Sequence, residues 1–291
     1  MRRVLLILAL LFGAVSCNYD SEYRGEEPAG GESDYRVVEY MPAPGQFINE
    51  GFEARTMAEA IDYAESRLAR RQYVSLGGFG GYIVFRFAEP ITNLGGYDFA
   101  IQGNAFTTSS EPGIVWVMCD ANTNGLADDV WYELAGSETG AATTVANYSV
   151  TYFRPTADSR PVAWRDSEGA EGQIDYLPTQ HKQPTYYPLW VDAESYTLSG
   201  TRLAERNYQN STTWVAPAYE WGYADNYSAH DWLAERKTVN CFDIAMAVDA
   251  NGVAVELPTI DFVKVQSAVN AKSGHLGEIS TEVCDIFRYA N

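Results

Sequence analysis

Oxygen-bearing side chains recur at a metal-binding spacing in residues 120–133, whose sequence is DANTNGLADDVWYE. Counted from Asp120, side-chain oxygens stand at the first, third, fifth and ninth positions and a glycine stands at the sixth. Calcium loops use this spacing because the glycine allows the sharp turn that brings hard oxygen ligands around one cation. The spacing predicts a structural calcium site formed by Asp120, Asn122, Asn124, the carbonyl oxygen of Leu126, and Asp128.

The end of this loop departs from the EF-hand pattern. The twelfth position is Trp131 where an EF-hand has a bidentate glutamate, so Asp129 or Glu133 would have to supply that ligand. The loop lies between two apolar segments of strand type rather than two helices, and so resembles the calcium loops of β proteins. The alternative is a plain hairpin turn without a metal, because asparagine, aspartate and glycine favour such turns as well.

Aromatic rings alternate with amide and carboxylate groups in residues 214–232, WVAPAYEWGYADNYSAHDW. Such a surface suits a large, flat or amphipathic neutral ligand, which stacks on the ring faces and forms hydrogen bonds at its edge. For any single ring the alternative is a place in the core. The predicted ligand-binding residues are Trp190, Trp214, Trp221, Tyr223, Asp225, Asn226 and Trp232.

The sequence offers little for catalysis. His181, His230 and His275 are far apart, and no serine-hydrolase, zinc-protease or cysteine–histidine signature is present. Carboxylate pairs of the glycosidase type are available among 39 acidic residues, but their separation in space does not follow from sequence. The glycines of residues 75–81 lack dinucleotide-binding spacing and indicate tight turns. We expect no catalytic residues and no enzymatic activity.

Composition favours a β-rich globular chain and excludes nucleic acid as a partner. Of the 291 residues 46% are hydrophobic, which is enough for one large domain or two small ones. The 20 tyrosines, 12 phenylalanines and 7 tryptophans favour strands over a helical bundle. Acidic residues exceed basic ones by 39 to 20, and a surface with a formal charge of −19 repels a polyanion.

The order of apolar and polar residues predicts one helix followed by many short strands. Residues 52–71 place apolar side chains at three- and four-residue intervals and end in arginines, as an amphipathic helix does. Short alternating segments follow, cut by Gly, Pro, Asn and Asp. They begin at residues 82, 97, 114, 130, 148, 195, 242, 260 and 281. This spacing indicates a β-sandwich or jelly roll, with no internal repeat.

A single β-sandwich domain over residues 39–291 accounts for this pattern. Residues from about 154 to 240 are less regular and rich in Trp and Tyr, and we interpret them as long, insertion-like loops of that sandwich. A second small domain in this region is the alternative.

The N-terminus has the pattern of a bacterial lipoprotein signal. Two arginines precede a short apolar run, and residues 14–17 read AVSC, which resembles a lipobox. We therefore expect residues 1–17 to be a signal peptide with Cys17 as the lipid anchor, and an ordinary secretory signal is the alternative. Residues 18–38 are rich in acidic residues, Gly and Ser without apolar periodicity, which predicts a flexible acidic tether.

The acidic residues of the tether resemble the surface-export signals of Bacteroidetes lipoproteins. They stand shortly after the lipobox, at Asp20, Glu22, Glu26 and Glu27. The resemblance implies a protein on the outer-membrane surface of the cell that is attached to the membrane by its lipid anchor only. A merely solvated linker would have a similar composition.

Six further segments resemble one family. They are residues 42–50 (PAPGQFINE), 75–87 (SLGGFGGYIVFRF), 95–106 (GGYDFAIQGNAF), 111–138 (EPGIVWVMCDANTNGLADDVWYELAGSE), 221–226 (WGYADN) and 260–283 (IDFVKVQSAVNAKSGHLGEISTEV). Together they resemble the Bacteroidetes cell-surface lipoproteins associated with vitamin B12 uptake. The resemblance covers most of the chain after residue 42, and the string around the calcium-like loop is its most specific part.

The resemblance implies that the protein captures cobalamin or a related corrinoid outside the cell. It would then pass the corrinoid to an outer-membrane TonB-dependent transporter or to the surface lipoprotein of that transporter, without a chemical step. Cobalamin is bulky, nearly neutral and fringed with amides, which agrees with the aromatic and amide-rich residues 214–232. The alternative is a glycan-binding or adhesive module, because Trp and Tyr rings bind sugar faces equally well, and a glycan hydrolase is a third interpretation.

Overall fold

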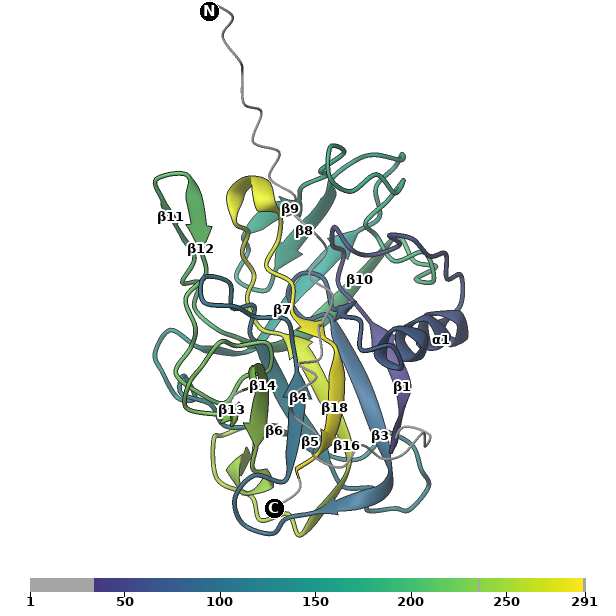
Figure 1. The fold of residues 1–291 in the computed structure, drawn as a ribbon. Helices are drawn as coiled ribbons and strands as arrows, with labels where there is room; N and C mark the ends of the chain where they lie inside the picture. Colours follow the sequence, from purple (N-terminus) through teal and green to yellow (C-terminus); the bar gives the residue numbers. More distant parts are fainter. Residues whose placement is uncertain (1–33, 235, 290–291) are drawn as a thin grey trace, which may run out of the picture.

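A computed structural model describes residues 34–234 and 236–289 of the chain (Figure 1). The predicted signal peptide, its anchor Cys17 and most of the predicted tether lie outside the described residues. The described part is mainly β with one α-helix, as the sequence predicted. No helix within it is long and apolar enough to cross a membrane.

The largest sheet has six antiparallel strands and forms one layer of the molecule. Its order is β1 (Tyr35–Met41), β3 (Tyr82–Thr92), β16 (Thr259–Ser267), β5 (Gly113–Met118), β6 (Tyr132–Leu134) and β15 (Ala247–Val248). Side chains alternate between its two faces, so Phe85 and Val263 join the main core while Val84 and Phe262 form a smaller cluster on the other face. Strand β16 comes late in the sequence but lies between β3 and β5.

A second antiparallel sheet packs on the first and makes the molecule a sandwich. Its order is β10 (Ser195–Arg202), β7 (Val145–Phe153), β8 (Val162–Asp166) and β9 (Glu171–Ile174). Tyr152, Val162 and Leu198 from this sheet belong to the same core as Phe85 and Val263 of the first. The interpretation of residues 154–240 as insertion-like loops is therefore partly wrong, because this region contributes β8, β9 and β10, three of the four strands of the second sheet.

The remaining strands form smaller sheets, one of which lies in front of the main sheet in the view of Figure 1 and packs on the same core. One sheet has the order β13 (Trp232–Leu233), β14 (Arg236–Phe242), β4 (Phe99–Gln102) and β18 (Asp285–Arg288). Two strand pairs complete the set, β2 (Val74–Ser75) with β17 (Glu282–Val283), and β11 (Tyr208–Asn210) with β12 (Thr213–Val215). The strand predicted from residue 242 is wrong, because Asp243 caps a short 3-10 helix at Ile244–Met246.

Helix α1 (Met57–Leu68) is shorter than the predicted 52–71. Thr56 and Glu59 form a capping box, in which each side chain bonds the backbone of the other and fixes the start of the helix. Ala60, Ala64 and Leu68 are its buried face. Small side chains on that face let the helix approach strand β1, whose Val37 N–H donates to Glu65 Oε1 at 3.0 Å.

Strand β1 begins inside the segment predicted to be a flexible tether. Tyr35 pairs with Phe87 of β3, and its ring packs edge-on against Phe85 at a centroid distance of 5.3 Å. The prediction is therefore wrong for residues 35–38, which belong to the sheet. The isolated sequence YRVVEYM shows no clear alternation, and the partner strand β3 supplies what orders it.

Candidate functional site

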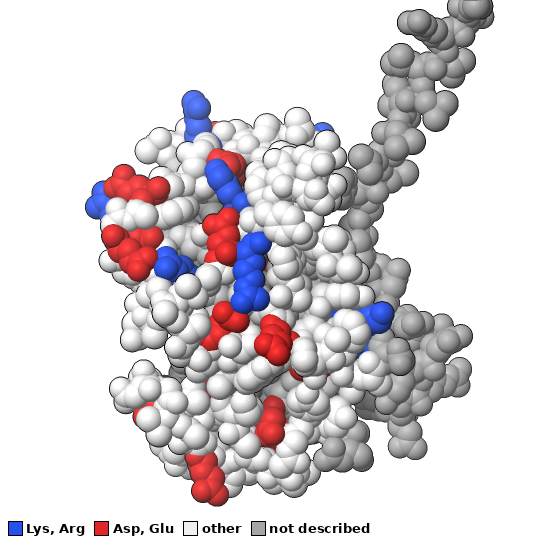
Figure 2. Space-filling view, turned by 90° about the vertical axis from the view of Figure 1, so that its left-hand side faces the viewer, with Lys and Arg blue, Asp and Glu red and all other residues white. Residues whose placement is uncertain are grey.

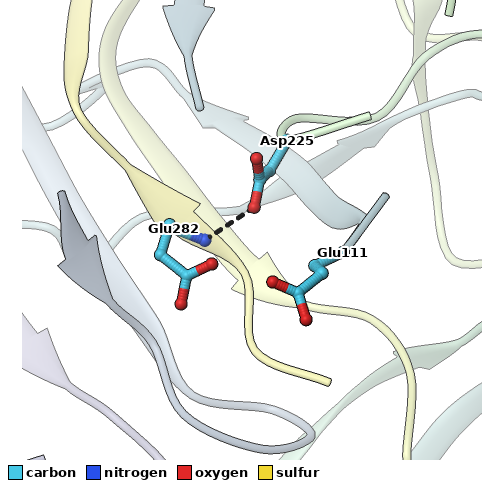
Figure 3. A group of neighbouring side chains, drawn as sticks. All are labelled: Glu111, Asp225 and Glu282. Carbon is cyan, nitrogen blue, oxygen red and sulfur yellow. Dashed lines mark hydrogen bonds between the residues drawn. The ribbon is translucent and has the colours of Figure 1, made fainter. Parts of the chain in front are cut away.

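Three carboxyl groups meet from segments that are far apart in the sequence (Figure 3), and each segment is one of those that carry the family resemblance. Glu111 precedes β5, Asp225 lies in the connection between β12 and β13, and Glu282 begins β17. One carboxylate oxygen of each lies within 4.8 Å of the others. Asp225 and Glu282 are buried and Glu111 is half-buried. We refer to these three residues as the acidic triad.

Asp225 joins distant parts of the chain through backbone hydrogen bonds. Its Oδ1 accepts from the N–H groups of Asn104 and Ala105, both at 2.8 Å, and its Oδ2 accepts from Glu282 N–H at 2.9 Å (Figure 3). A Cβ atom on Gly103 would lie 2.3 Å from Oδ1, so the glycine is needed for this close approach. Asp225 itself has a positive φ of 53°, a strained conformation that these bonds offset.

The triad has to share protons at neutral pH. Burial raises the pKa of Glu111 to about 8, and the neighbouring Asp225 adds to the shift. Burial also raises the pKa of Asp225 to about 7, against its amide hydrogen bonds, which favour the charged form. The pKa of Glu282 is raised well above its usual range by burial and by both neighbours. Ser280 Oγ donates to Glu282 Oε1 at 3.0 Å. Protons or a cation can neutralise this cluster.

The calcium-like loop brings its predicted ligands together. Asp120 accepts from the N–H groups of Asn124 at 3.0 Å and Gly125 at 2.8 Å. The amide Nδ2 of Asn124 lies 3.1 Å from Asp128 Oδ2, and that of Asn122 lies 3.3 Å from Asp128 Oδ1. In this arrangement Asn122 Oδ1 accepts from Asn124 N–H at 2.9 Å and Asn124 Oδ1 accepts from Leu126 N–H at 2.7 Å, so both amide oxygens have backbone partners within the turn. The four side chains lie together, but their hydrogen bonds are those of a plain turn, and a calcium ion would require both amide groups to exchange these partners for the ion. The calcium site therefore stays a prediction.

The loop folds back onto the outer face of the main sheet. Gly125 has a φ of +75°, and its carbonyl oxygen accepts from Arg86 Nη1 on β3 at 3.0 Å. Just after the loop, the ring of Trp131 packs edge-on against Phe262 of β16 at a centroid distance of 6.5 Å. Ordering of the loop is therefore coupled to the packing of this face.

A hollow of about 240 Å³ lies beside the second sheet. It is formed by the hairpin of β8 and β9 with Trp164, by Glu205 after β10, and by the segment from Asn270 to Glu278. Its lining mixes an indole ring, amides, carboxylates and one ammonium group. Glu205 and Lys272 are exposed, so the hollow opens to solvent at the surface.

Four of the predicted ligand-binding residues are structural, and the prediction of an exposed binding cluster is wrong for them. Trp190 is only 8% exposed and packs against Tyr40, and Tyr223 is 1% exposed. Asp225 and Asn226 are fully buried, and the amide of Asn226 bonds the backbone of Tyr219 in both directions. Fully buried groups have no face to offer a ligand.

The three remaining predicted rings are half-buried and belong to separate contacts. Trp214 on β12 covers Gly274, where an added Cβ would lie 2.7 Å from its Nε1. Trp232 packs against Tyr227 at a ring centroid distance of 5.1 Å. At Trp221, the backbone carbonyl oxygen accepts a hydrogen bond from Ser137 N–H. None of the seven predicted residues lines the hollow. Sequence reasoning missed Trp164 and Glu278, since no local signal connects residues so far apart.

No protein-family model matches the chain, and no curated protein matches it either. The function therefore has to be argued from the geometry described above and from the sequence resemblance. The acidic triad serves the architecture, the calcium-like loop orders one face, and the hollow offers space for a ligand. Of the three, the hollow is the candidate binding site.

We predict that calcium stabilises the protein through the loop. EDTA should lower the melting temperature of the wild type by roughly 5 °C or more, because a bound ion stabilises only the folded state. Asp128→Ala should remove this sensitivity. Asp249→Ala is the control, since Asp249 accepts from the N–H groups of Asn251 and Val253 in an exposed turn outside the loop. An unchanged melting temperature on chelation, with no metal in the purified protein, would make the loop a plain turn.

We also predict that stability falls as pH rises from about 5 to 8. The raised pKa values of Glu111 and Asp225 mean that the folded triad binds more protons than the unfolded chain in this window. For each group, a pKa difference of 1 between the folded and unfolded states corresponds to about 1.4 kcal/mol of stability. Glu282→Gln carries a neutral amide in place of the protonated carboxyl group. This variant should therefore weaken the dependence of stability on pH.

Glu256→Gln, at an exposed position, is the control and should leave the pH dependence unchanged. Thermal unfolding at several pH values, with EDTA present, measures the dependence in the wild type and both variants. Equal slopes in all three proteins would contradict the prediction.

Proposed function

We propose that the chain is a surface-exposed lipoprotein that binds cobalamin or a related corrinoid and passes it to an outer-membrane uptake system. The observation that carries the proposal is the hollow beside Trp164. It is too small to enclose a corrinoid and would receive one edge of it. The family resemblance supports the choice of ligand, and we propose no chemical step.

The chemistry of the hollow suits such an edge. The indole of Trp164 offers an apolar face, and the amide oxygens of Asn270 and Gln173 offer acceptors. The amide nitrogens of these two residues donate to Tyr148 and Asp175. A corrinoid is nearly neutral and carries primary amides on short arms, which pair with such groups. Two of the lining charges already neutralise each other, because Lys272 Nζ lies 2.6 Å from Asp175 Oδ2.

A glycan is the second candidate ligand, and one observation favours it. Trp164 stands near the carboxylates of Asp175 and Glu205, and an aromatic ring beside carboxylates is a common arrangement for stacking a sugar face and binding its hydroxyls. The two ligands differ in what they present to the hollow, amides in one case and hydroxyls in the other. Binding measurements therefore separate them.

The surface supports a neutral ligand and a protein partner rather than a polyelectrolyte. Figure 2 shows one face of the molecule, on which acidic and basic groups are interspersed among broad uncharged areas. The excess of 39 acidic over 20 basic residues is therefore not gathered into one patch on this face. We propose as partner a TonB-dependent transporter or its surface lipoprotein, with the membrane reached through the lipid anchor on Cys17 alone.

Titration with cyanocobalamin tests the ligand. The wild type should bind cyanocobalamin, and binding should change the visible absorption spectrum of the cyanocobalamin. Trp164→Leu should weaken binding by roughly ten- to a hundredfold, as expected for the loss of a stacked ring. Trp190→Ala is the matched control, because it should cost about 3 to 5 kcal/mol of stability and leave the affinity of the folded protein unchanged. A wild-type protein that does not bind cyanocobalamin but binds oligosaccharides would favour the glycan alternative.

A separate experiment tests the anchor. Cys17→Ala should abolish lipid labelling and shift the protein out of the outer-membrane fraction, because the acylated thiol is the attachment that we propose. Metabolic labelling with a fatty acid, followed by membrane fractionation, measures both effects. A wild type that takes up no label and is processed in the presence of globomycin would refute the lipoprotein assignment.

A further inference from the structure

The four most exposed large hydrophobic side chains of the described residues lie in loops at one end of the main sheet. They are Leu94, Leu126, Val130 and Val253, and each is between 58% and 72% exposed. A single exposed aliphatic side chain is ordinary on a protein surface, whereas several at one end indicate a contact surface. We refer to these four residues as the aliphatic tips.

The directions of the strands place the loops of the aliphatic tips together. Every strand of the main sheet is antiparallel to its neighbours, so β3, β5 and β15 end at the same end of the sheet at which β1, β6 and β16 begin. Residues 93–98 follow β3, residues 119–131 follow β5 and residues 249–258 follow β15. The three loops therefore leave the sheet at one end, which is the lower end in Figure 1.

Hydrogen bonds hold the tips in ordered turns. Leu94 N–H donates to Asp98 Oδ1 at 3.0 Å, and Val253 N–H donates to Asp249 Oδ1 at 2.9 Å. The side chains of Leu94 and Val253 are thus presented to solvent on a backbone that is already fixed. Moving them into an apolar environment therefore costs little ordering entropy.

The chain enters the fold at this same end. Asp34 directly precedes β1, and its carbonyl oxygen accepts from Ala88 N–H of β3 at 2.9 Å. The 17 residues from Asn18 to Asp34 can span at most about 60 Å. A lipid anchor on Cys17 therefore holds this end of the sheet closer to the bilayer than the opposite end.

The charge of the three loops selects the kind of surface that they can meet. Together, residues 93–98, 119–131 and 249–258 hold six acidic residues and no lysine or arginine. Loops of this charge are repelled by anionic lipid headgroups but not by zwitterionic ones. Aliphatic side chains on such loops therefore suit a zwitterionic lipid surface.

We propose that the lower end of the main sheet docks on a zwitterionic lipid surface by inserting the aliphatic tips between the headgroups. The inference rests on the lipid anchor of the proposed function and adds a second contact with the bilayer. This contact alone is weak and reversible, and the anchor keeps it in place.

Docking at this end fixes the orientation of the molecule. Strand β16 begins at the lower end and finishes at the opposite one, and the segment from Asn270 to Glu278 that lines the hollow follows it. The hollow therefore lies away from the bilayer and stays open to the surrounding medium. The hairpin of β11 and β12 also lies at that opposite end (Figure 1).

Binding to phosphatidylcholine vesicles tests the proposal. The protein is the mature chain, residues 17–291, with Cys17→Ala, so that no acyl chain contributes. We expect this parent chain to cosediment with the vesicles at high lipid concentration. Leu94→Asp should lower its partition coefficient at least about tenfold, because it replaces an inserted aliphatic group by a charge.

Tyr208→Asp is the matched control, because it adds the same charge at an exposed large side chain on β11. It should leave the partition coefficient unchanged. Val253→Asp repeats the test on a second loop if Leu94→Asp lowers the melting temperature. A parent chain that does not bind the vesicles overturns the inference, and so do Leu94→Asp and Tyr208→Asp variants that bind them equally well.

A second copy of the chain is the other occupant that the experiment detects. Sedimentation velocity without lipid measures the oligomeric state of the parent chain and of Leu94→Asp. A dimer that Leu94→Asp dissociates would assign the aliphatic tips to a contact between copies and would overturn docking on lipid. A monomer in both cases agrees with the proposal.

The outcomes separate this inference from the proposed function. Vesicle binding that depends on Leu94, in a protein that carries no lipid on Cys17 or does not bind cyanocobalamin, supports the inference and refutes the anchor or the ligand. An acylated, cyanocobalamin-binding protein whose Cys17→Ala form does not bind vesicles supports the proposed function and refutes the inference.

Discussion

The carboxyl group of Asp225 is the point on which the fold depends most. Its two oxygens accept backbone hydrogen bonds from the turn after β4 and from the start of β17, segments that are far apart in the sequence. A buried carboxyl group without such bonds would be strongly unfavourable, so its burial selects one arrangement of these segments. Four of the six segments quoted for the family resemblance meet here, namely 95–106, 111–138, 221–226 and 260–283. This gives them an architectural meaning that does not depend on any ligand.

Sequence periodicity predicted the parts of the fold in which local pattern and burial agree. In strands β3, β5 and β16 the apolar residues alternate with polar ones or form continuous runs, because these strands lie inside the main sheet. In helix α1 the apolar residues follow the 3.6-residue repeat of a helix. Strands β8 and β9 were missed, since polar residues face solvent and glycine interrupts the pattern in 162–174. Strand β1 is ordered by its pairing with β3 rather than by its own sequence.

The same distinction holds for the sites. The convergence of the calcium-like loop was predictable, because its four side-chain ligands lie within nine residues of one another. The hollow was not, because it joins a hairpin near residue 170 to a segment near residue 275. The aromatic residues were misinterpreted for a physical reason: a large ring can fill the core as readily as it can line a binding site. Trp190 packs against Tyr40, and Tyr223 is 1% exposed and packs against Tyr219.

The late position of β16 in the sequence has a consequence for biosynthesis. This strand is central in the main sheet, and Glu282 near the C-terminus supplies a bond to Asp225. An emerging chain therefore cannot close its core until nearly all of it has been made, whereas domains built from local contacts can fold as they appear. Under the export that we propose, this delay is an advantage, because an unfolded polypeptide is what a narrow translocation channel accepts. A chain that stopped before β16 would leave β3 and β5 without the strand that joins them.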